Sequence, residues 1–229
     1  MKRINIMKYE QSYNLREEIK TLRTNIQFCG NDKKVILVTS CLPGEGKTTT
    51  AFEMAQSFAE LKKNVLLIDA DIRKSMIISR LGINGEVEHG LSHFLSGQST
   101  LSEVILSTNI PKLHVMVAGP TVPNPTELLA SDRFASMLKS CKEVYDYIFI
   151  DSAPLGAVID GAIIGKECDG SIMVMESGTV KYKLAQEVKG KLQNAGCPLL
   201  GVVFNKADIK RQKGYYGKFY QKRYEKYGN

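Results

Sequence analysis

The sequence of 229 residues contains no apolar run close to the roughly 20 residues that a membrane-spanning helix needs. The opening residues, MKRINIMKYEQSYNLREE, become polar too early for a secretory signal peptide. The five cysteines are widely spaced without a CxxC pair, and His89 and His93 have no further plausible metal ligand near them in sequence. These absences argue against a disulfide framework and a zinc site. We therefore expect a cytoplasmic protein with reduced thiols.

The charge of the chain is unevenly distributed. The formal net charge is +7, and the segment 209–229 alone holds seven basic residues and one acidic residue, a net charge of +6. From Gly214 onward this segment has no aliphatic residue, so it cannot pack a core. We expect a single domain over residues 1–208, followed by a flexible basic tail over residues 209–229.

Short apolar runs alternate with helical patterns along the first 208 residues. Six strands are expected, at residues 35–39, in the run ending at Asp69, and at 113–119, 145–151, 170–176 and 199–205. Helices are expected at about 14–28, 47–62, 126–141, 157–167 and 181–195. Near-continuous apolar strands separated by helices indicate a mostly parallel sheet with helices on both faces. The predicted fold class is therefore α/β, doubly wound, and ligands in such sheets bind at the carboxyl ends of the strands.

A glycine-bearing loop, PGEGKTT, lies between the first expected strand and the following helix. Its glycines allow backbone N–H groups to turn inward around phosphate oxygens, and the new helix directs its positive dipole end at the anion. Lys47 can reach the β- and γ-phosphates, and the Thr48 hydroxyl can ligate magnesium. The usual pattern begins with glycine where this sequence has Cys41. We assign nucleotide binding to the whole motif: Pro43, Gly44, Glu45, Gly46, Lys47, Thr48 and Thr49.

Three aspartates stand at strand ends, where a site is expected. In VLLIDADIR, Asp69 and Asp71 are two residues apart, so an extended backbone points both carboxylates the same way. Arg73 is a candidate for contacting phosphate or an acidic neighbour. In YIFIDSAP, Asp151 ends an apolar run, as in a Walker B strand whose carboxylate holds magnesium. Such carboxylates with magnesium and a nucleotide would form a phosphoryl-transfer centre; the alternative for VLLIDADIR is an aspartate-rich turn.

The last apolar run closes with the tripeptide FNK. Asn205 at its end can read the edge of a nucleotide base through paired hydrogen bonds, so we include it among the nucleotide-binding candidates. A simple strand end is the alternative interpretation.

The tail carries half of the ten tyrosines of the chain. A basic segment interleaved with aromatic residues can bind nucleic acid or an anionic membrane surface. The alternative is a phosphorylation substrate, in which each phosphate adds roughly −1.5 to −2 charge, so that three or four cancel the tail's charge. We favour the second interpretation and name as phosphoacceptors Tyr215, Tyr216, Tyr220, Tyr224 and Tyr227.

Together, PGEGKTT, LLIDADIR and IFIDSAP resemble the bacterial tyrosine kinases, in which a P-loop ATPase fold phosphorylates tyrosine. The segment AGPTVPNPTELLASDRF, residues 118–134, is similar to the family's stretch between its second and third motifs. The resemblance runs from about residue 14 to the end. It implies a MinD- and ParA-like fold, with ATP or ADP and Mg²⁺ as ligands.

The resemblance also implies roles for individual residues. By position, Lys47 and Thr48 would hold the phosphates and magnesium, and Asp71 and Asp151 would be linked to magnesium. Asp69 would be the base that accepts the proton of the tyrosine hydroxyl.

The family's assembly has implications as well. Its oligomerisation motif ExxRxxR is represented here by Glu17, Lys20 and Arg23, with lysine in place of the first arginine. The resemblance implies self-association, with a ring as one form that it can take, and phosphorylation of the tail in trans. It further implies a membrane-anchored activator subunit, recruitment through it to the inner face of the plasma membrane, and control of capsular or exopolysaccharide synthesis and export.

Three other functions are alternatives to the kinase. Switch ATPases of the ParA and MinD type share the fold, but they carry a lysine near the start of the loop where this chain has Leu42, and they lack a tyrosine row. A non-catalytic nucleotide-dependent scaffold is the second. A nucleic-acid-binding module using the tail is the third, and we rank nucleic acid low as a partner.

Overall fold

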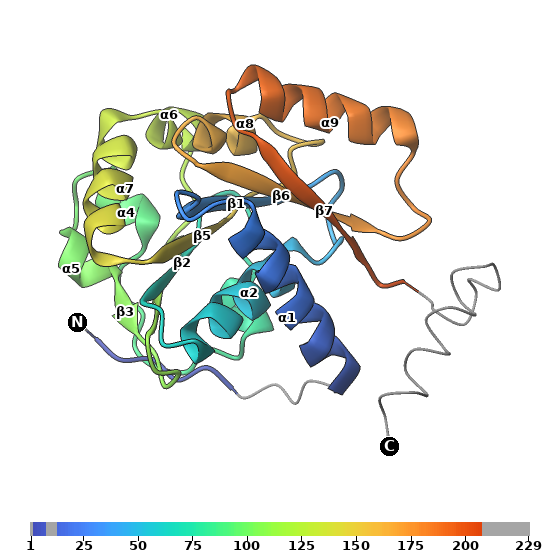
Figure 1. Cartoon of the computed structure of the whole chain (residues 1–229). Helices are drawn as coiled ribbons and strands as arrows, with labels where there is room; N and C mark the ends of the chain where they lie inside the picture. Colours follow the sequence, from blue (N-terminus) through green and yellow to red (C-terminus); the bar gives the residue numbers. More distant parts are fainter. Residues whose placement is uncertain (1, 8–12, 208–229) are drawn as a thin grey trace.

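The computed structural model describes residues 2–7 and 13–207 (Figure 1). The five predicted phosphoacceptor tyrosines and the rest of the predicted tail lie outside these residues. A seven-stranded sheet forms the centre, in the order β3-β4-β2-β5-β1-β6-β7. All neighbouring strands are parallel except the short pair β3 and β4, which is antiparallel. The α/β, doubly wound fold class is confirmed.

The six strands expected from the apolar runs are all present, together with one short strand that the sequence did not indicate. The strands are β1 (Val35–Ser40), β2 (Val65–Asp69), β3 (Leu106–Ser107), β4 (Leu113–Met116), β5 (Tyr147–Asp151), β6 (Gly170–Glu176) and β7 (Leu199–Asn205). The helices are α1 (Tyr13–Phe28), α2 (Lys47–Glu60), α3 (Ile77–Arg80), α4 (Leu91–Leu95), α5 (Leu101–Val104), α6 (Pro125–Leu129), α7 (Asp132–Val144), α8 (Asp160–Gly165) and α9 (Tyr182–Asn194).

The single helix expected at 126–141 is wrong, because the chain forms α6 and α7 with a break between them. Ser131 has an extended backbone at the break, and its hydroxyl accepts a hydrogen bond from the N–H of Phe134. A serine in this position caps the N-terminus of a new helix and interrupts the preceding one. The break therefore has a local cause that periodicity alone does not reveal.

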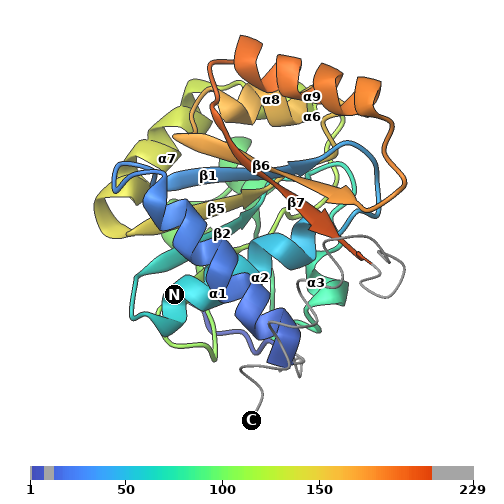
Figure 2. The ribbon, with the colours of Figure 1, turned by 45° about the vertical axis from the view of Figure 1, so that its right-hand side comes forward.

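Helices cover both faces of the sheet, which explains why its strands are apolar almost throughout. α1 and α2 lie on one face, and α7, α8 and α9 lie on the other (Figures 1 and 2). Successive residues of a strand point to opposite faces. On β1, for example, Ile36 packs into the core with Phe58 of α2, whereas Leu37 packs into the core with Phe134 of α7. Within the described residues, no helix has both the length and the apolar character that crossing a membrane requires.

The strand order brings three chain segments to one edge of the sheet, which we call the carboxyl edge. β5 lies between β2 and β1, so the end of β2, the end of β5 and the loop after β1 are neighbours. In the register of β2 against β5, Asp69 lies opposite Asp151. Residues from three separate motifs of the sequence therefore meet where parallel α/β folds bind ligands.

α1 packs on α2, and one of the predicted oligomerisation residues, Arg23, bonds to α2. Nη1 of Arg23 donates hydrogen bonds to the carbonyl oxygen and the hydroxyl of Ser57, at 2.8 and 2.9 Å. Lys20 forms an ion pair with Glu17 at 2.7 Å. Arg23 thus stabilises the fold of its own chain, and its part in self-association stays a prediction.

Beneath α1, the side chain of Glu53 on α2 is buried, with 3% of its surface exposed. Its Oε2 has no hydrogen-bond partner among the residues that the structure describes. Burial, and secondly the charge of Glu60, raises the pKa of the Glu53 carboxyl from 4.5 to about 7. Arg16 and Lys20 of α1 line the small cavity beside it. Above pH 7 the fold therefore carries a buried carboxylate that costs stability.

Replacing Glu53 should make the protein more stable at alkaline pH. Because the folded-state pKa lies above the unfolded value, the folded state favours the protonated carboxyl, and this stability is lost as pH rises from about 4.5 through 7. Urea unfolding should give Glu53→Gln a free energy of unfolding about 2 to 3 kcal/mol above the wild type at pH 8, and a clearly smaller gain at pH 5. The exposed Glu143→Gln is the control; an equal gain at both pH values would contradict the burial argument.

Candidate active site

The loop between β1 and α2 has the backbone that phosphate binding requires. Gly44 and Gly46 have φ values of 83° and 94°, in the left-handed region that favours glycine. A Cβ on Gly46 would also lie 2.0 Å from Nδ2 of Asn205. Gly46 caps α2 without a side-chain hydrogen bond, so the first N–H groups of this helix are available to an anion.

Cys41 replaces the usual first glycine without strain. Its backbone φ is not positive, and its buried Sγ lies 3.7 Å from Sδ of Met173. Burial raises the pKa of the Cys41 thiol to about 11, so the group is a neutral, apolar packing element. The departure from the usual motif is therefore compatible with the loop conformation.

The side chain of Glu45 turns back and supports the loop. It is 2% exposed; Oε2 accepts a hydrogen bond from the N–H of Leu42 at 2.6 Å, and Oε1 accepts one from the N–H of Glu176 at 3.0 Å. These bonds connect the loop to the end of β6. Any contribution of Glu45 to nucleotide binding would therefore be made by its backbone and by the position that its side chain gives the loop.

The end of β7 also holds the loop. Nδ2 of Asn205 donates to the carbonyl oxygen of Glu45 at 2.9 Å, so this amide contacts the loop backbone. Nζ of Lys206 donates to the carbonyl oxygen of Gly44 at 3.0 Å and pairs with Glu176 at 2.7 Å. Neither Lys206 nor Glu176 was predicted from the sequence, although FNK pointed to this strand end.

Lys47 lies between two buried carboxylates. Its Nζ is 3.6 Å from Oδ2 of Asp71 and 3.9 Å from Oδ1 of Asp151. Asp71 and Asp151 are 7% and 2% exposed, and their motifs are 80 residues apart in sequence. The predicted meeting of the loop lysine with both aspartate motifs is thus observed in the fold.

Two carboxylates of the site, those of Asp151 and Asp69, are hard to ionise. Burial raises the pKa of Asp151, while the charge of Lys47 and the hydroxyl of Thr48 lower it. Burial raises the pKa of Asp69 as well, and the charge of Asp151 raises it further. Because two neighbouring carboxylates in a low dielectric repel each other, one of the pair is the better proton acceptor.

The polar atoms near Lys47 suit a magnesium ion. Oδ1 of Asp151 is buried and has no hydrogen-bond partner within the described part of the chain. It is accompanied by the hydroxyl of Thr48 and the carboxylate of Asp71, all hard oxygen ligands of the kind that Mg²⁺ prefers. The described residues include no group of three or more His, Cys, Asp or Glu side chains placed to enclose a metal.

Asp69 is held by two hydrogen bonds. Its Oδ1 accepts from the N–H of Asp71 at 3.1 Å, and its Oδ2 accepts from the hydroxyl of Ser75. Asp71 in turn accepts from the N–H of Lys74 at 3.0 Å. The segment after β2 is therefore an ordered turn around its two aspartates, and Ser75 is a neighbour of the site that the sequence did not reveal.

Arg73 contacts an acidic neighbour, which is one of its two predicted partners. Its Nε and Nη2 donate to the two oxygens of Asp160 on α8, at 2.5 and 3.0 Å, and Nη2 also donates to the hydroxyl of Thr126 on α6. Asp160 is 1% exposed. The fold thus gathers Lys47, Thr48 and the three aspartates, while the guanidinium of Arg73 is committed to α8.

Comparisons with known proteins show the family of the chain. A family model described as an AAA domain matches residues 33–177. The tyrosine-protein kinase CpsD of Streptococcus pneumoniae is 45% identical over 221 residues, covering 95% of this chain and 94% of the relative. The chain belongs to the bacterial tyrosine kinase family.

Solved structures place the kinase in the same group. The crystal structure of the chimerical protein CapA2B2 matches with a TM-score of 0.81 and 30% identity, over 89% of this chain and 92% of that one. The kinase domain of Escherichia coli tyrosine kinase ETK matches with a TM-score of 0.78 and 30% identity, over 84% and 77%. The MinD protein of Pyrococcus horikoshii, solved with Mg-ADP, is 22% identical with a TM-score of 0.64, a likeness of fold alone.

Removing the guanidinium of Arg73 should destabilise the kinase. Arg73→Ala leaves the buried Asp160 carboxylate unpaired. The free energy of unfolding, measured with urea, should therefore fall by about 2 to 3 kcal/mol. Arg73→Lys keeps the positive charge and should recover only part of this loss, because an ammonium group cannot form the two parallel hydrogen bonds of a guanidinium group. The neighbouring exposed Lys74→Ala is the control, with a change below about 0.5 kcal/mol. Unchanged stability together with a raised KM for ATP would instead assign Arg73 to phosphate binding.

Proposed function

We propose that this kinase uses ATP and Mg²⁺ to phosphorylate the tyrosine cluster of its own C-terminal tail in trans. The observation that carries the proposal is the position of Lys47 between Asp71 and Asp151, beside Asp69, in a member of a tyrosine kinase family. The chain has both a phosphate-binding loop and, in its own sequence, a row of acceptor tyrosines.

The residues of the site divide the reaction between them. The loop N–H groups and Lys47 bind the phosphates of ATP. Thr48, Asp71 and Asp151 would hold Mg²⁺, which supplies positive charge to the phosphate oxygens when bound. In the structure Lys47 pairs with two carboxylates. We infer that the ammonium group of Lys47 contacts the phosphates instead of the carboxylates once the nucleotide is bound. Asp71 and Asp151 would then be available to the cation.

The transfer step needs a proton acceptor at the tyrosine. The tyrosine oxygen forms a bond to the γ-phosphorus, the bond from that phosphorus to the β–γ bridging oxygen breaks, and ADP leaves with this oxygen. The hydroxyl proton passes to a carboxylate oxygen of Asp69. Burial raises the pKa of Asp69, which makes it a better base than an exposed aspartate.

The assembly and the cellular role are proposed on the resemblance to the bacterial tyrosine kinases. We propose for this chain the role that its resemblance to the bacterial tyrosine kinases implies, the regulation of capsular or exopolysaccharide synthesis and export. We propose that a membrane-anchored adaptor recruits the cytoplasmic kinase to the inner face of the plasma membrane and activates it. Self-association through Glu17, Lys20 and Arg23 would use the exposed side of α1 or replace the contacts of Arg23 with Ser57.

The competing functions make different predictions for one assay. A ParA- or MinD-type switch would hydrolyse ATP without forming phosphotyrosine, and a non-catalytic scaffold would do neither. Leu42, 37% exposed, stands where the switch ATPases carry their additional lysine, which favours the kinase.

Replacing Lys47 should abolish phosphotyrosine formation. The chain is incubated with ATP and Mg²⁺, with and without the candidate adaptor's cytoplasmic segment, and phosphotyrosine is mapped by mass spectrometry. We expect phosphate on tyrosines within residues 215–227. In Lys47→Met the amount of phosphotyrosine should fall at least about 100-fold, because the positive charge that contacts the phosphates of ATP is lost. The exposed Lys63→Met is the control and should retain activity. ATP hydrolysis by the wild type without any phosphotyrosine would identify a switch ATPase.

Transfer in trans is tested by mixing two chains. Lys47→Met with an intact tail serves as acceptor, and an active chain truncated at Lys213 serves as enzyme and should retain ATP binding. Four strand spacings, about 19 Å, separate β7 from β2. An extended tail can span this distance, so reach permits both routes and the mixture decides. Phosphate on the inactive chain is expected; an unmodified acceptor would mean that transfer occurs within one chain.

A further inference from the structure

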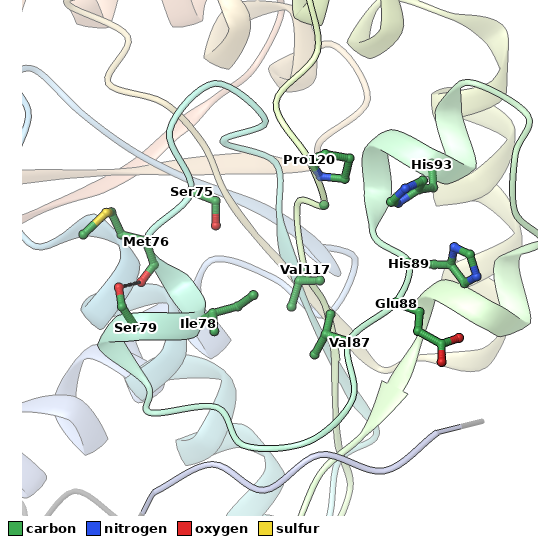
Figure 3. A pocket seen from close by; sticks show the side chains of 11 residues that line it. Ser75, Met76, Ile78, Ser79, Val87, Glu88, His89, His93, Val117 and Pro120 are labelled. Atoms are coloured by element: carbon green, nitrogen blue, oxygen red, sulfur yellow. Dashed lines mark hydrogen bonds between the residues drawn. The ribbon is translucent and has the colours of Figure 1, made fainter.

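A pocket of about 420 Å³ opens beside the active site, at the carboxyl edge of β2 and β4. Its lining comes from three segments, residues 75–79, 87–93 and 117–120 (Figure 3). Residues 80–86 connect the first of these segments to the second. The contacts of this connection decide how firmly the pocket wall is held in place.

The segment of residues 2–7, which we call the strap, is bound to the edge of the sheet beside β3 (Figure 1). The N–H of Ile4 donates to the carbonyl oxygen of Ser107 on β3 at 2.9 Å. The N–H of Ser107 donates to the carbonyl oxygen of Lys2, also at 2.9 Å. The strap thus extends the sheet beyond β3, as an additional short strand would.

Ile6 is the second anchor of the strap. The side-chain amide of Asn109 accepts a hydrogen bond from the N–H of Ile6 at 2.9 Å and donates one to its carbonyl oxygen at 3.0 Å. The side chains of Ile4 and Ile6 are 0% and 3% exposed, in the same core cluster as Ile77 of α3 and Ile83. Burial of two isoleucine side chains favours the bound position of the strap.

On its other side the strap binds the chain that follows α3. The N–H of Met7 donates to the carbonyl oxygen of Leu81, the C-cap of α3, at 3.2 Å. Asn5 and Asn84 exchange both of their backbone hydrogen bonds, each at 2.8 Å. The strap therefore lies between β3 and the connection, and it is bonded to both.

The far part of the connection depends on the strap. The ammonium group of Lys2 pairs with Glu88 at 2.6 Å and with Glu86 at 3.9 Å. Within the part of the chain that the structure describes, the hydrogen bonds and ion pairs of residues 84–88 are all made with residues 2–5. Releasing the strap would thus leave this stretch without any of its polar contacts.

Ser75 connects α3 to the proposed base. It lines the pocket, lies two residues before α3, and donates from its hydroxyl to Oδ2 of Asp69. α3 is a single turn, and only five residues separate Ser75 from Leu81, which the strap holds. A displacement of so short a turn would move the hydroxyl that orients the Asp69 carboxylate.

We propose that Ile4, Ile6 and Asn109 are positioning residues for the phosphoryl transfer, because through the strap they hold α3, and with it Ser75, against Asp69. The inference rests on the proposed function and adds to it a support outside the nucleotide and magnesium sites. A small displacement of a positioned group can lower a rate by roughly one to two powers of ten.

The place of the strap in the sheet separates its effect from nucleotide binding. β3 and β4 lie on the opposite side of β2 from β1, whose end carries the phosphate loop. Loosening the strap should therefore change the transfer step and leave the affinity for ATP intact.

The strap can be loosened at Asn109, since Asn109→Ala removes both hydrogen bonds to Ile6. The full-length kinase is assayed with ATP, Mg²⁺ and the candidate adaptor's cytoplasmic segment. The maximal rate of phosphotyrosine formation should fall about tenfold, while the KM for ATP changes less than about twofold. Asn64→Ala is the matched control, because it removes an asparagine hydrogen bond to Lys112 at the amino ends of the strands. It should change neither constant.

A second substitution shows whether the strap acts through Ser75. Ser75→Ala alone should also lower the maximal rate about tenfold, and the double variant with Asn109→Ala should be no slower than the slower single variant. A loss of about a hundredfold in the double variant would mean independent effects, such as a smaller folded fraction, and would overturn the proposal. A maximal rate within about twofold of the wild type in either single variant would overturn it too.

Amide hydrogen exchange tests the strap without the reaction. The N–H groups of Leu81 and Asn84 are both hydrogen-bonded. In Asn109→Ala both should exchange at least about tenfold faster than in the wild type, whereas the N–H of Thr50 in α2 should be unchanged. Faster exchange at Asn84 alone would show that α3 is held without the strap, which contradicts the proposal. A wild-type protein that forms no phosphotyrosine overturns the proposed function, and the exchange rates then decide whether the strap holds α3.

Discussion

The position of Lys47 between Asp71 and Asp151 is the interaction on which the active site depends. Two carboxylates within 4 Å of one ammonium group, all largely buried, are acceptable in a fold because the opposite charge offsets their desolvation. The same arrangement also bears on the proposed reaction. In the proposed reaction the phosphates of ATP would take the ammonium group of Lys47, and the two carboxylates would then be available to Mg²⁺.

Several hydrogen bonds near Lys47, Asp71 and Asp151 hold the phosphate loop and the strand ends in place. The buried carboxylate of Glu45 bonds to both its own loop and the end of β6, and Asn205 bonds to the loop from β7. Lys206 adds a further bond at the last described turn before the tail. The phosphate loop is therefore attached to the strand from which the proposed acceptor segment departs.

The site has two sides that meet at Asp69. The side toward β1, β6 and β7 is built of glycine, backbone N–H groups and charge, as phosphate recognition requires. The side toward β4 is built of apolar side chains and imidazole rings, with Ser75 at the border.

Several features were determined by the sequence alone, because their causes are local. Apolar runs and helical periodicity placed the main strands and helices, and PGEGKTT with its neighbouring strand predicted the phosphate loop. The partner of Arg73 and the pocket beyond Ser75 were decided only by the tertiary structure. Arg73 meets Asp160 across 87 residues, and the pocket joins three segments because β4 lies beside β2. Strand order is a property of the whole chain, so no local pattern could reveal which side chains it brings together.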